Sequence, residues 1–131
     1  MLARLFAPTI EVSAHCDLSC GVYDPAQARI EAQSVKAIIE KMKDNDDPEF
    51  RTRAILIKEQ RSELVKHHLW VLWTDYFKPP HFEKYPDLHS LFNSTIKQAS
   101  ACKQSNDPAD GQKLLDGIAQ IDAIFWETKK A

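Results

Sequence analysis

Three aspartate–proline pairs divide this chain more sharply than any other feature of its sequence: Asp24-Pro25, Asp47-Pro48 and Asp107-Pro108. Aspartate is a favoured N-cap because its carboxylate accepts a hydrogen bond from a free N–H in the first helical turn. Proline suits the next position, where its fixed φ is helical and its missing N–H is not needed. Each pair therefore predicts the start of a helix, and Pro86 predicts a further start for the same reason.

The segments after these starts carry apolar residues at steps of three and four, as the buried face of a helix does. We expect helices over about 25–43, 48–77, 86–104 and 108–128, the second ending before two consecutive prolines. Glycine is scarce, with three in 131 residues, and the connectors are short. The sequence therefore predicts an all-α fold, an antiparallel four-helix bundle over about residues 24–129.

The composition excludes several classes of function. Seventeen basic residues are spread among nineteen acidic ones, so a surface that tracks phosphates, and with it a nucleic-acid partner, is not expected. No apolar run approaches the roughly 20 residues that a membrane-spanning helix needs. Three cysteines in a chain of this length are typical of a thiol-bearing cytoplasmic protein.

Residues 1–14 read as a leader rather than as part of the bundle. They end in small residues, as a secretory signal does, but Pro8 and Glu11 leave the apolar stretch shorter than the roughly 7 to 15 residues an export signal requires. We interpret 1–14 as a propeptide that is removed without serving export. Removal would make His15 the amino terminus of a domain over residues 15–131.

The segment 15–23, HCDLSCGVY, holds two cysteines and a histidine that the bundle does not explain. The cysteine pair alone is equally consistent with a reversible disulfide or two buried thiols, and no second pair completes a zinc site. Cys102 is isolated. The four remaining histidines are interpreted as structural, with two of them in a proline-bounded connector: His67, His68, His81 and His89.

A free amino terminus at His15 changes this interpretation. His15 then supplies an α-amine and an imidazole, while Cys16 supplies a backbone nitrogen and a thiolate in adjoining chelate rings. A bound cation can displace the amine and thiol protons near neutral pH. With Cys20 the donors form a plane of two nitrogens and two sulfurs, which suits Ni(II) or Cu(II), and the imidazole of His15 can approach as an axial ligand.

The stretch HCDLSCGVYDPAQARIEAQSVKAIIEKM resembles the amino terminus of the nickel-containing superoxide dismutases, whose mature chains begin with a His-Cys-Asp-x-x-Cys-Gly-x-Tyr nickel hook. The likeness continues through NDDPEF, IKEQR, KHH, WTDYFKPPHFEKYP and IAQIDAIFWETKKA. It implies a hook over 15–23 before a four-helix bundle, one nickel per subunit and a homohexamer. The implied reaction is the disproportionation of superoxide to O2 and H2O2, with the metal cycling between Ni(II) and Ni(III).

The resemblance also implies roles for particular residues. The nickel ligands fall on His15, Cys16 and Cys20, and Tyr23 and Asp17 lie beside the open face of the metal. Glu31 and Arg61 orient the axial imidazole, and Tyr76 supports Tyr23. Lys78 and Lys103 draw in the anion. Without the resemblance, Glu31, Arg61 and the lysines would be interpreted as a solvated helix face.

One residue departs from the family pattern. The family usually has proline at the position of Ser19, after a cis peptide bond. A cis bond before serine costs about 2.5 to 4 kcal/mol, against about 0.5 to 1 before proline. We therefore expect this hook to retain its metal less tightly than a Ser19→Pro variant does.

Two other functions remain open from the sequence. One is a metal-free thiol–disulfide or peroxide-sensing bundle that uses Cys16 and Cys20, and the other is a non-enzymatic helical interaction module. The dismutase needs a processing protease for residues 1–14, whereas the redox bundle needs neither processing nor metal. Metal analysis of the processed chain distinguishes the dismutase from both.

Overall fold

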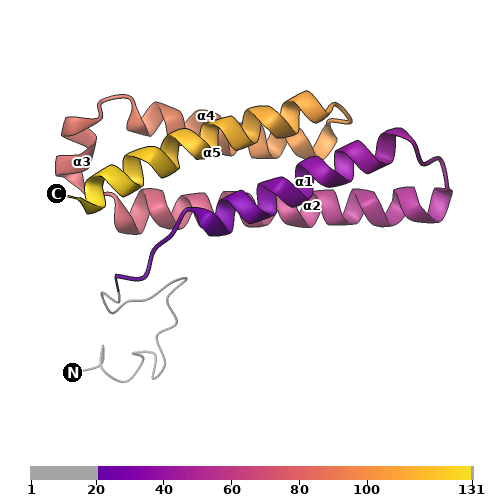
Figure 1. Ribbon diagram of the computed structural model, residues 1–131, viewed down its shortest axis with the longest axis horizontal. Helices are drawn as coiled ribbons and strands as arrows, with labels where there is room; N and C mark the ends of the chain where they lie inside the picture. The colour runs from indigo at the N-terminus through magenta and orange to yellow at the C-terminus, as the bar shows by residue number, and fades with distance from the viewer. Residues whose placement is uncertain (1–20, 131) are drawn as a thin grey trace, which may run out of the picture.

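The computed structural model describes residues 21–130, and all regular secondary structure in that part of the chain is helical. Four long helices are joined by short turns, and one connection contains a π-helical turn and a short helix (Figure 1). In chain order the elements are α1 (Ala26–Lys43), α2 (Pro48–Val71), η2 (Leu72–Tyr76), α3 (Pro79–Lys84), α4 (Leu88–Gln104) and α5 (Pro108–Lys129).

The aspartates of the three Asp-Pro pairs all accept a backbone N–H close after them. Asp47 accepts from the third residue after it at 2.8 Å and Asp107 from the second at 2.9 Å, and α2 and α5 begin at the adjoining prolines. Asp24 accepts from Ala26 at 2.8 Å, but α1 begins at Ala26, so Pro25 lies one residue before the helix. The predicted starts are therefore right to within one residue at these three places.

The four long helices run alternately along the same axis, each antiparallel to the next along the chain (Figure 1). Helix α1 packs against α2 and α5, and α4 packs against the same two helices from the other side. This order closes a square bundle, so the predicted antiparallel four-helix architecture is confirmed. The interior is formed by the apolar stripes of all four helices, including Val35, Ile39, Leu69, Phe92, Leu114, Ile118, Ile121 and Phe125.

The connection between α2 and α4 differs from the prediction. The last turn of the long second helix is a π-helix, in which Phe77 N–H donates to the Leu72 carbonyl at 3.0 Å. Pro79 and Pro80 do more than end that helix: they form the first turn of α3, where the missing N–H groups cost nothing. Pro86 opens no helix, because α4 begins two residues later at Leu88.

Two histidines consequently lie in helices rather than in an irregular connector. His81 belongs to α3 and His89 to the first turn of α4. None of the helices in residues 21–130 is both long enough and apolar enough to cross a membrane.

Candidate metal centre

The predicted ligands His15, Cys16 and Cys20, and Asp17 beside them, lie outside the described residues. Within residues 21–130 no group of three or more histidine, cysteine, aspartate or glutamate side chains is placed to hold a metal ion. The structure describes the last three residues of the predicted hook, 21–23, and the helices that they contact. The first described residue is Gly21, whose φ of +68° is a left-handed conformation that favours glycine.

Tyr23 packs beside Tyr76 at the end of the bundle where the described chain begins. The two ring centroids are 5.6 Å apart and the rings are tilted by 54°. Tyr76 comes from the π-helical turn, and its ring also lies 4.4 Å from that of Phe125 on α5. The resemblance implies that Tyr76 supports Tyr23, and the structure brings the two rings into contact.

The hydroxyl of Tyr76 is tied to the end of α5. It lies 2.7 Å from the Thr128 hydroxyl, which is itself 2.6 Å from the Phe125 carbonyl. Because a carbonyl can only accept, the Thr128 hydroxyl donates to the Phe125 carbonyl and accepts a hydrogen bond from the Tyr76 hydroxyl. The Lys129 ammonium lies 5.0 Å from the centre of the Tyr76 ring. Sequence reasoning missed Thr128 and Lys129, since nothing local marks a helix end that folds onto a tyrosine.

Glu31 and Arg61 form an ion pair between α1 and α2. One guanidinium nitrogen of Arg61 donates to both carboxylate oxygens of Glu31, at 3.1 and 3.3 Å. The Glu31 side chain is 16% exposed and that of Arg61 43% exposed, so the pair lies at the rim of the bundle. An open depression of about 510 Å³ adjoins it on α2, lined by Gln60, Arg61, Glu63, Leu64 and His67.

The two predicted guiding lysines have different surroundings. Lys78 is exposed at the start of α3, near the tyrosine pair. Lys103 is next to the last residue of α4, roughly 22 Å along that helix from its start. Its ammonium contacts Glu59 at 3.1 Å and also Glu63. The hydrogen bond to Glu63 raises the pKa of Lys103, and the same bond lowers the pKa of Glu63.

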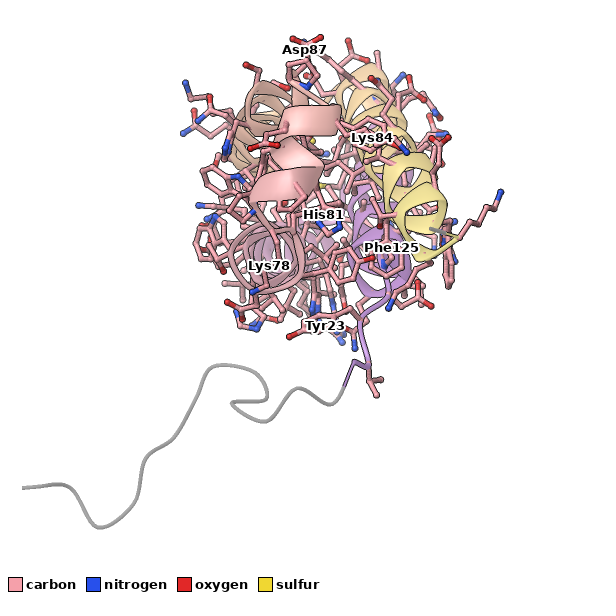
Figure 2. The ribbon with its side chains drawn as sticks, turned by 90° about the vertical axis from the view of Figure 1, so that its left-hand side faces the viewer. Tyr23, Lys78, His81, Lys84, Asp87 and Phe125 are labelled. Carbon is pink, nitrogen blue, oxygen red and sulfur yellow. The ribbon has the colours of Figure 1, made fainter. Side chains whose placement is uncertain are left out.

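His81 is a further residue at this end of the bundle that the sequence interpretation treated as merely structural. Its Nδ1 accepts the backbone N–H of Lys78 at 3.0 Å, and its ring stacks on that of Tyr76. Figure 2 shows Tyr23, Lys78, His81 and Phe125 gathered at the same end of the molecule. The position of His81 in the first turn after a proline pair was the available signal.

These features define an all-helical bundle protein with a tyrosine pair and a carboxylate–guanidinium pair near the end where its amino-terminal segment joins. The sequence profile of the family described as nickel-containing superoxide dismutase matches residues 10–129. The chain therefore belongs to the nickel-containing superoxide dismutase family.

Individual relatives agree with this assignment. A superoxide dismutase [Ni] of Streptomyces coelicolor is 75% identical over 131 residues, and one of Streptomyces seoulensis is 73% identical; each is covered completely, as is this chain. A native structure of nickel superoxide dismutase superposes with a TM-score of 0.87 at 75% sequence identity. The match covers 89% of this chain and 100% of that one.

Proposed function

We propose that this protein is a nickel-dependent superoxide dismutase, which converts two superoxide anions and two protons into O2 and H2O2. The observation that carries the proposal is the 75% identity, over the whole of both chains, to a superoxide dismutase [Ni]. The matched region contains the HCDLSCGVY segment and all the helices of the described structure. The enzyme is accordingly an oxidoreductase with nickel as its cofactor.

The donor set of the hook fits nickel. An amine, a backbone nitrogen and two thiolates are donors that would suit nickel, and soft thiolates would stabilise the higher oxidation state that a redox cycle needs. Held there, nickel would supply one-electron redox chemistry for the conversion of superoxide. We propose His15, Cys16 and Cys20 as its ligands.

The described residues would position the ligands and the substrate. Glu31, held by Arg61, is proposed to orient the imidazole of His15, in the way that carboxylates commonly orient histidines bound to metals. Tyr23, backed by Tyr76, is proposed to limit access to small anions, together with Asp17 on the open face. The exposed ammonium of Lys78 would attract superoxide toward this end of the bundle.

We also propose that Lys103 attracts superoxide, but less strongly than Lys78 does. Two carboxylates contact its ammonium and Lys66 contacts one of them, so these four charges cancel and the local charge around Lys103 is not positive. Such a cluster attracts an anion less than a free lysine does. Its contribution is therefore expected to be weaker than that of Lys78.

We propose that residues 1–14 are removed before the enzyme is active, because an α-amine that is still part of a peptide bond cannot serve as a ligand. The length of the solved structure agrees with this: the match covers all of that chain and leaves 11% of this one, about 14 residues, without a counterpart. A protease must then cut between Ala14 and His15, and we propose that the processed enzyme works in the cytoplasm.

We also propose that the enzyme assembles as a homohexamer. Several large apolar side chains of the long helices and the segment before them are exposed in the single chain, at 37% to 74%: Val22, Ile30, Ile55, Leu56, Leu64, Trp70 and Trp126. Exposed side chains of this size are available to be covered where subunits pack together. Sedimentation of the nickel-loaded enzyme tests the assembly state.

Amino-terminal mass analysis combined with nickel determination and a superoxide assay tests the function. The chain that begins at His15 is expected to bind about one nickel and to be active, whereas the chain with residues 1–14 attached is expected to be inactive. The matched control is a processed chain with Cys16→Ser, which removes one thiolate and leaves the bundle intact. Activity without nickel would instead favour the thiol–disulfide alternative, and neither metal nor activity would favour the interaction module.

A further inference from the structure

His81 lies between two residues that the proposed function places on the superoxide-facing side of the centre. Its Nδ1 accepts the N–H of Lys78 at 3.0 Å. Its ring lies parallel to that of Tyr76, with an interplanar angle of 12° and centroids 5.8 Å apart. Because a backbone N–H can only donate, Nδ1 must be unprotonated, and the neutral ring carries its proton on Nε2. The contact therefore selects one tautomer of the neutral imidazole.

The bond from Lys78 to His81 closes the start of α3. Lys78 is the N-cap and His81 the third helical residue, the position from which a glutamate or glutamine usually reaches back to the N-cap N–H. Pro79 and Pro80 occupy the intervening positions and have no N–H. The amide of Lys78 is thus the only backbone donor from Lys78 to Pro80, and His81 holds it.

The ring of His81 connects this cap to the tyrosine pair. On one side it stacks on Tyr76, and it also meets the edge of Phe77 at 90° with centroids 5.6 Å apart. Tyr76 in turn contacts Tyr23. A glutamine could make the cap, but only an aromatic acceptor makes the cap and the stack together.

We propose that His81 is a positioning residue for superoxide capture: its Nδ1 fixes the backbone of Lys78, and with it the place from which the Lys78 side chain extends into solvent. This inference rests on the proposed function, because it assigns the guiding of superoxide to Lys78. His81 touches no reacting atom and takes part in no chemical step.

Three variants of the processed, nickel-loaded enzyme separate the cap from the ring. His81→Gln keeps a side-chain acceptor at the third helical position, whereas His81→Phe keeps the ring and removes the acceptor. His89→Phe is the matched control. His89 lies in the same corner and its Nδ1 also accepts a hydrogen bond, but from the Trp73 indole at 2.9 Å, and its ring stacks on Phe82 at 3.8 Å.

Two measurements read out the position of Lys78. Hydrogen–deuterium exchange reports the Lys78 amide, because the two prolines after it contribute no signal. In His81→Phe we expect this amide to exchange about fivefold faster, which is the loss of a typical hydrogen bond. We also expect the salt dependence of kcat/KM, per bound nickel, to fall toward that of Lys78→Gln. Both quantities should stay at the parent value in His81→Gln and in His89→Phe.

The proposal requires both changes in His81→Phe and neither in the other two variants, and any other pattern overturns it. Equal losses in His89→Phe, for example, would indicate general loosening of the corner. The exchange measurement is repeated on protein without nickel, where the same fivefold difference is expected. A parent chain that binds no nickel or consumes no superoxide refutes the proposed function separately, and the role of His81 in capture fails with it.

Discussion

Arg61 on α2 contacts both carboxylate oxygens of Glu31 on α1, at 3.1 and 3.3 Å, across the junction of two antiparallel helices. Because α1 packs against α2, the contact with Arg61 holds the Glu31 carboxylate in one orientation. A carboxylate fixed in this way can hold an imidazole in one orientation. The pair is therefore more informative about function than about stability.

We expect Glu31→Gln to lower the nickel affinity or the activity per nickel by about 10- to 100-fold, the usual effect of removing such a partner. The free energy of unfolding should change by less than about 1 kcal/mol, because the Arg61 side chain is 43% exposed and water screens the pair. Nickel titration, a superoxide assay and urea denaturation measure the three quantities.

Glu40→Gln is the matched control for this change. Glu40 lies on the same helix and pairs with Lys36 at 3.6 Å, but it is more than two turns further from the start of α1. We expect no change in nickel affinity or activity. An equal loss in both variants would contradict a specific role for Glu31.

The hydrogen bond between Tyr76 and Thr128 predicts different results for two substitutions of the tyrosine. Tyr76→Phe removes the hydroxyl that donates a hydrogen bond to Thr128, at a cost of about 1 kcal/mol in unfolding free energy, but keeps the ring against Tyr23. Its activity should stay within a few-fold of the parent. Tyr76→Ala removes the ring and should lower activity much further.

A double-mutant cycle with Thr128→Val measures the bond itself. The two single changes and the double change should show a coupling energy of about 0.5 to 1.5 kcal/mol. Additive effects would mean that the two hydroxyls do not depend on each other. If Tyr76→Phe proved as inactive as Tyr76→Ala, the hydroxyl rather than the ring would be the functional group.

Lys78 and Lys103 are expected to contribute unequally to the capture of superoxide. Lys78→Gln should lower kcat/KM and weaken its dependence on ionic strength, because an exposed charge acts at a distance only until salt screens it. Lys103→Gln should change both quantities less, since Glu59 and Glu63 already surround its ammonium. Turnover below saturation, measured over a range of salt concentrations, compares the two. A larger effect at Lys103 would reverse this assignment.

The sequence predicts the bundle well because residues adjacent to each helix start, such as the Asp-Pro pairs, mark where the helix begins. Asp47 and Asp107 cap helices that begin at the next residue, and the apolar stripes between the caps match the buried faces. The α2–α4 connection was less predictable. A pair of prolines ends one helix, and whether it also begins another depends on contacts such as that between His81 and Lys78.

Some residues of the candidate site could be predicted from the sequence and others could not. Tyr23, Glu31, Arg61 and Tyr76 follow from the resemblance, and the structure brings them together in two pairs. The hydrogen bond from Tyr76 to Thr128 joins residues 52 positions apart. No spacing in the sequence reports a contact between helices so distant along the chain, so such residues emerge only from the packed bundle.

Cys102 is expected to take no part in thiol chemistry. It is buried on α4, and that burial raises the pKa of its thiol from 9.0 to about 11. Only the thiolate reacts with alkylating reagents. At pH 8 the folded apoprotein should therefore not be alkylated at Cys102, whereas the unfolded protein should be. Mass mapping identifies the modified residues, and rapid alkylation of Cys102 in the folded state would contradict its burial.

The same pKa predicts how stability depends on pH. Below pH 9 the thiol is protonated in both states. Between pH 9 and 11 the unfolded chain releases this proton and the folded one keeps it, so stability falls as the pH rises. The fall should be shallower in Cys102→Ala, which has no thiol at this position. Urea denaturation of both proteins from pH 8 to 10.5 measures the difference in slope.

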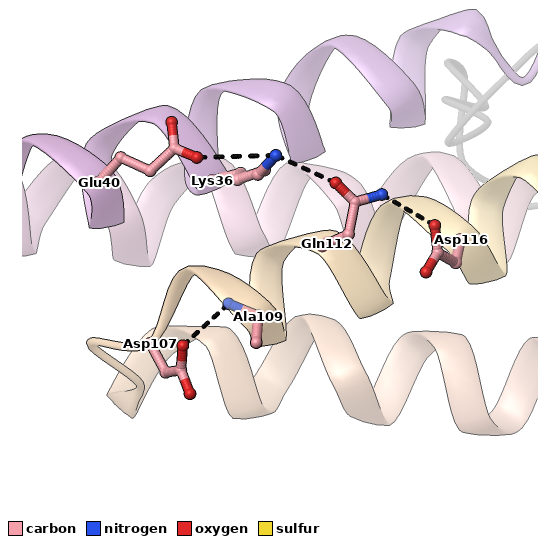
Figure 3. A network of polar contacts seen from close by, with 6 residues as sticks. All are labelled: Lys36, Glu40, Asp107, Ala109, Gln112 and Asp116. Atoms are coloured by element: carbon pink, nitrogen blue, oxygen red, sulfur yellow. Dashed lines mark hydrogen bonds and ion pairs between the residues drawn. The ribbon is translucent and has the colours of Figure 1, made fainter.

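Gly111 and Gly117 on α5 each lie close to a side chain of a neighbouring helix. We expect that shortening this side chain restores the stability lost in a Gly→Ala variant at one of the two positions but not at the other. A Cβ on Gly117 would lie 2.6 Å from the Thr95 hydroxyl oxygen, and one on Gly111 would lie 2.8 Å from the Cβ of Lys36. Gly111 lies at the α1–α5 seam, where Lys36 donates to Gln112 at 3.0 Å (Figure 3). Alanine gains about 1 kcal/mol in helix propensity, but such overlap costs typically 1 to 3 kcal/mol, so both Gly→Ala variants should be destabilised.

The rescue depends on which atoms collide. Thr95→Ala removes the two nearest atoms that a Cβ on Gly117 meets, so it should restore most of the stability lost in Gly117→Ala. Lys36→Ala keeps the Cβ and the Cα that a Cβ on Gly111 meets, so it should restore little in Gly111→Ala. Only separation of α1 and α5 can relieve that overlap, and these helices bury Val35 and Leu114 in the core. Thermal unfolding of the four single variants and the two double variants tests this: rescue of Gly111→Ala by Lys36→Ala would mean that the helices do not approach so closely.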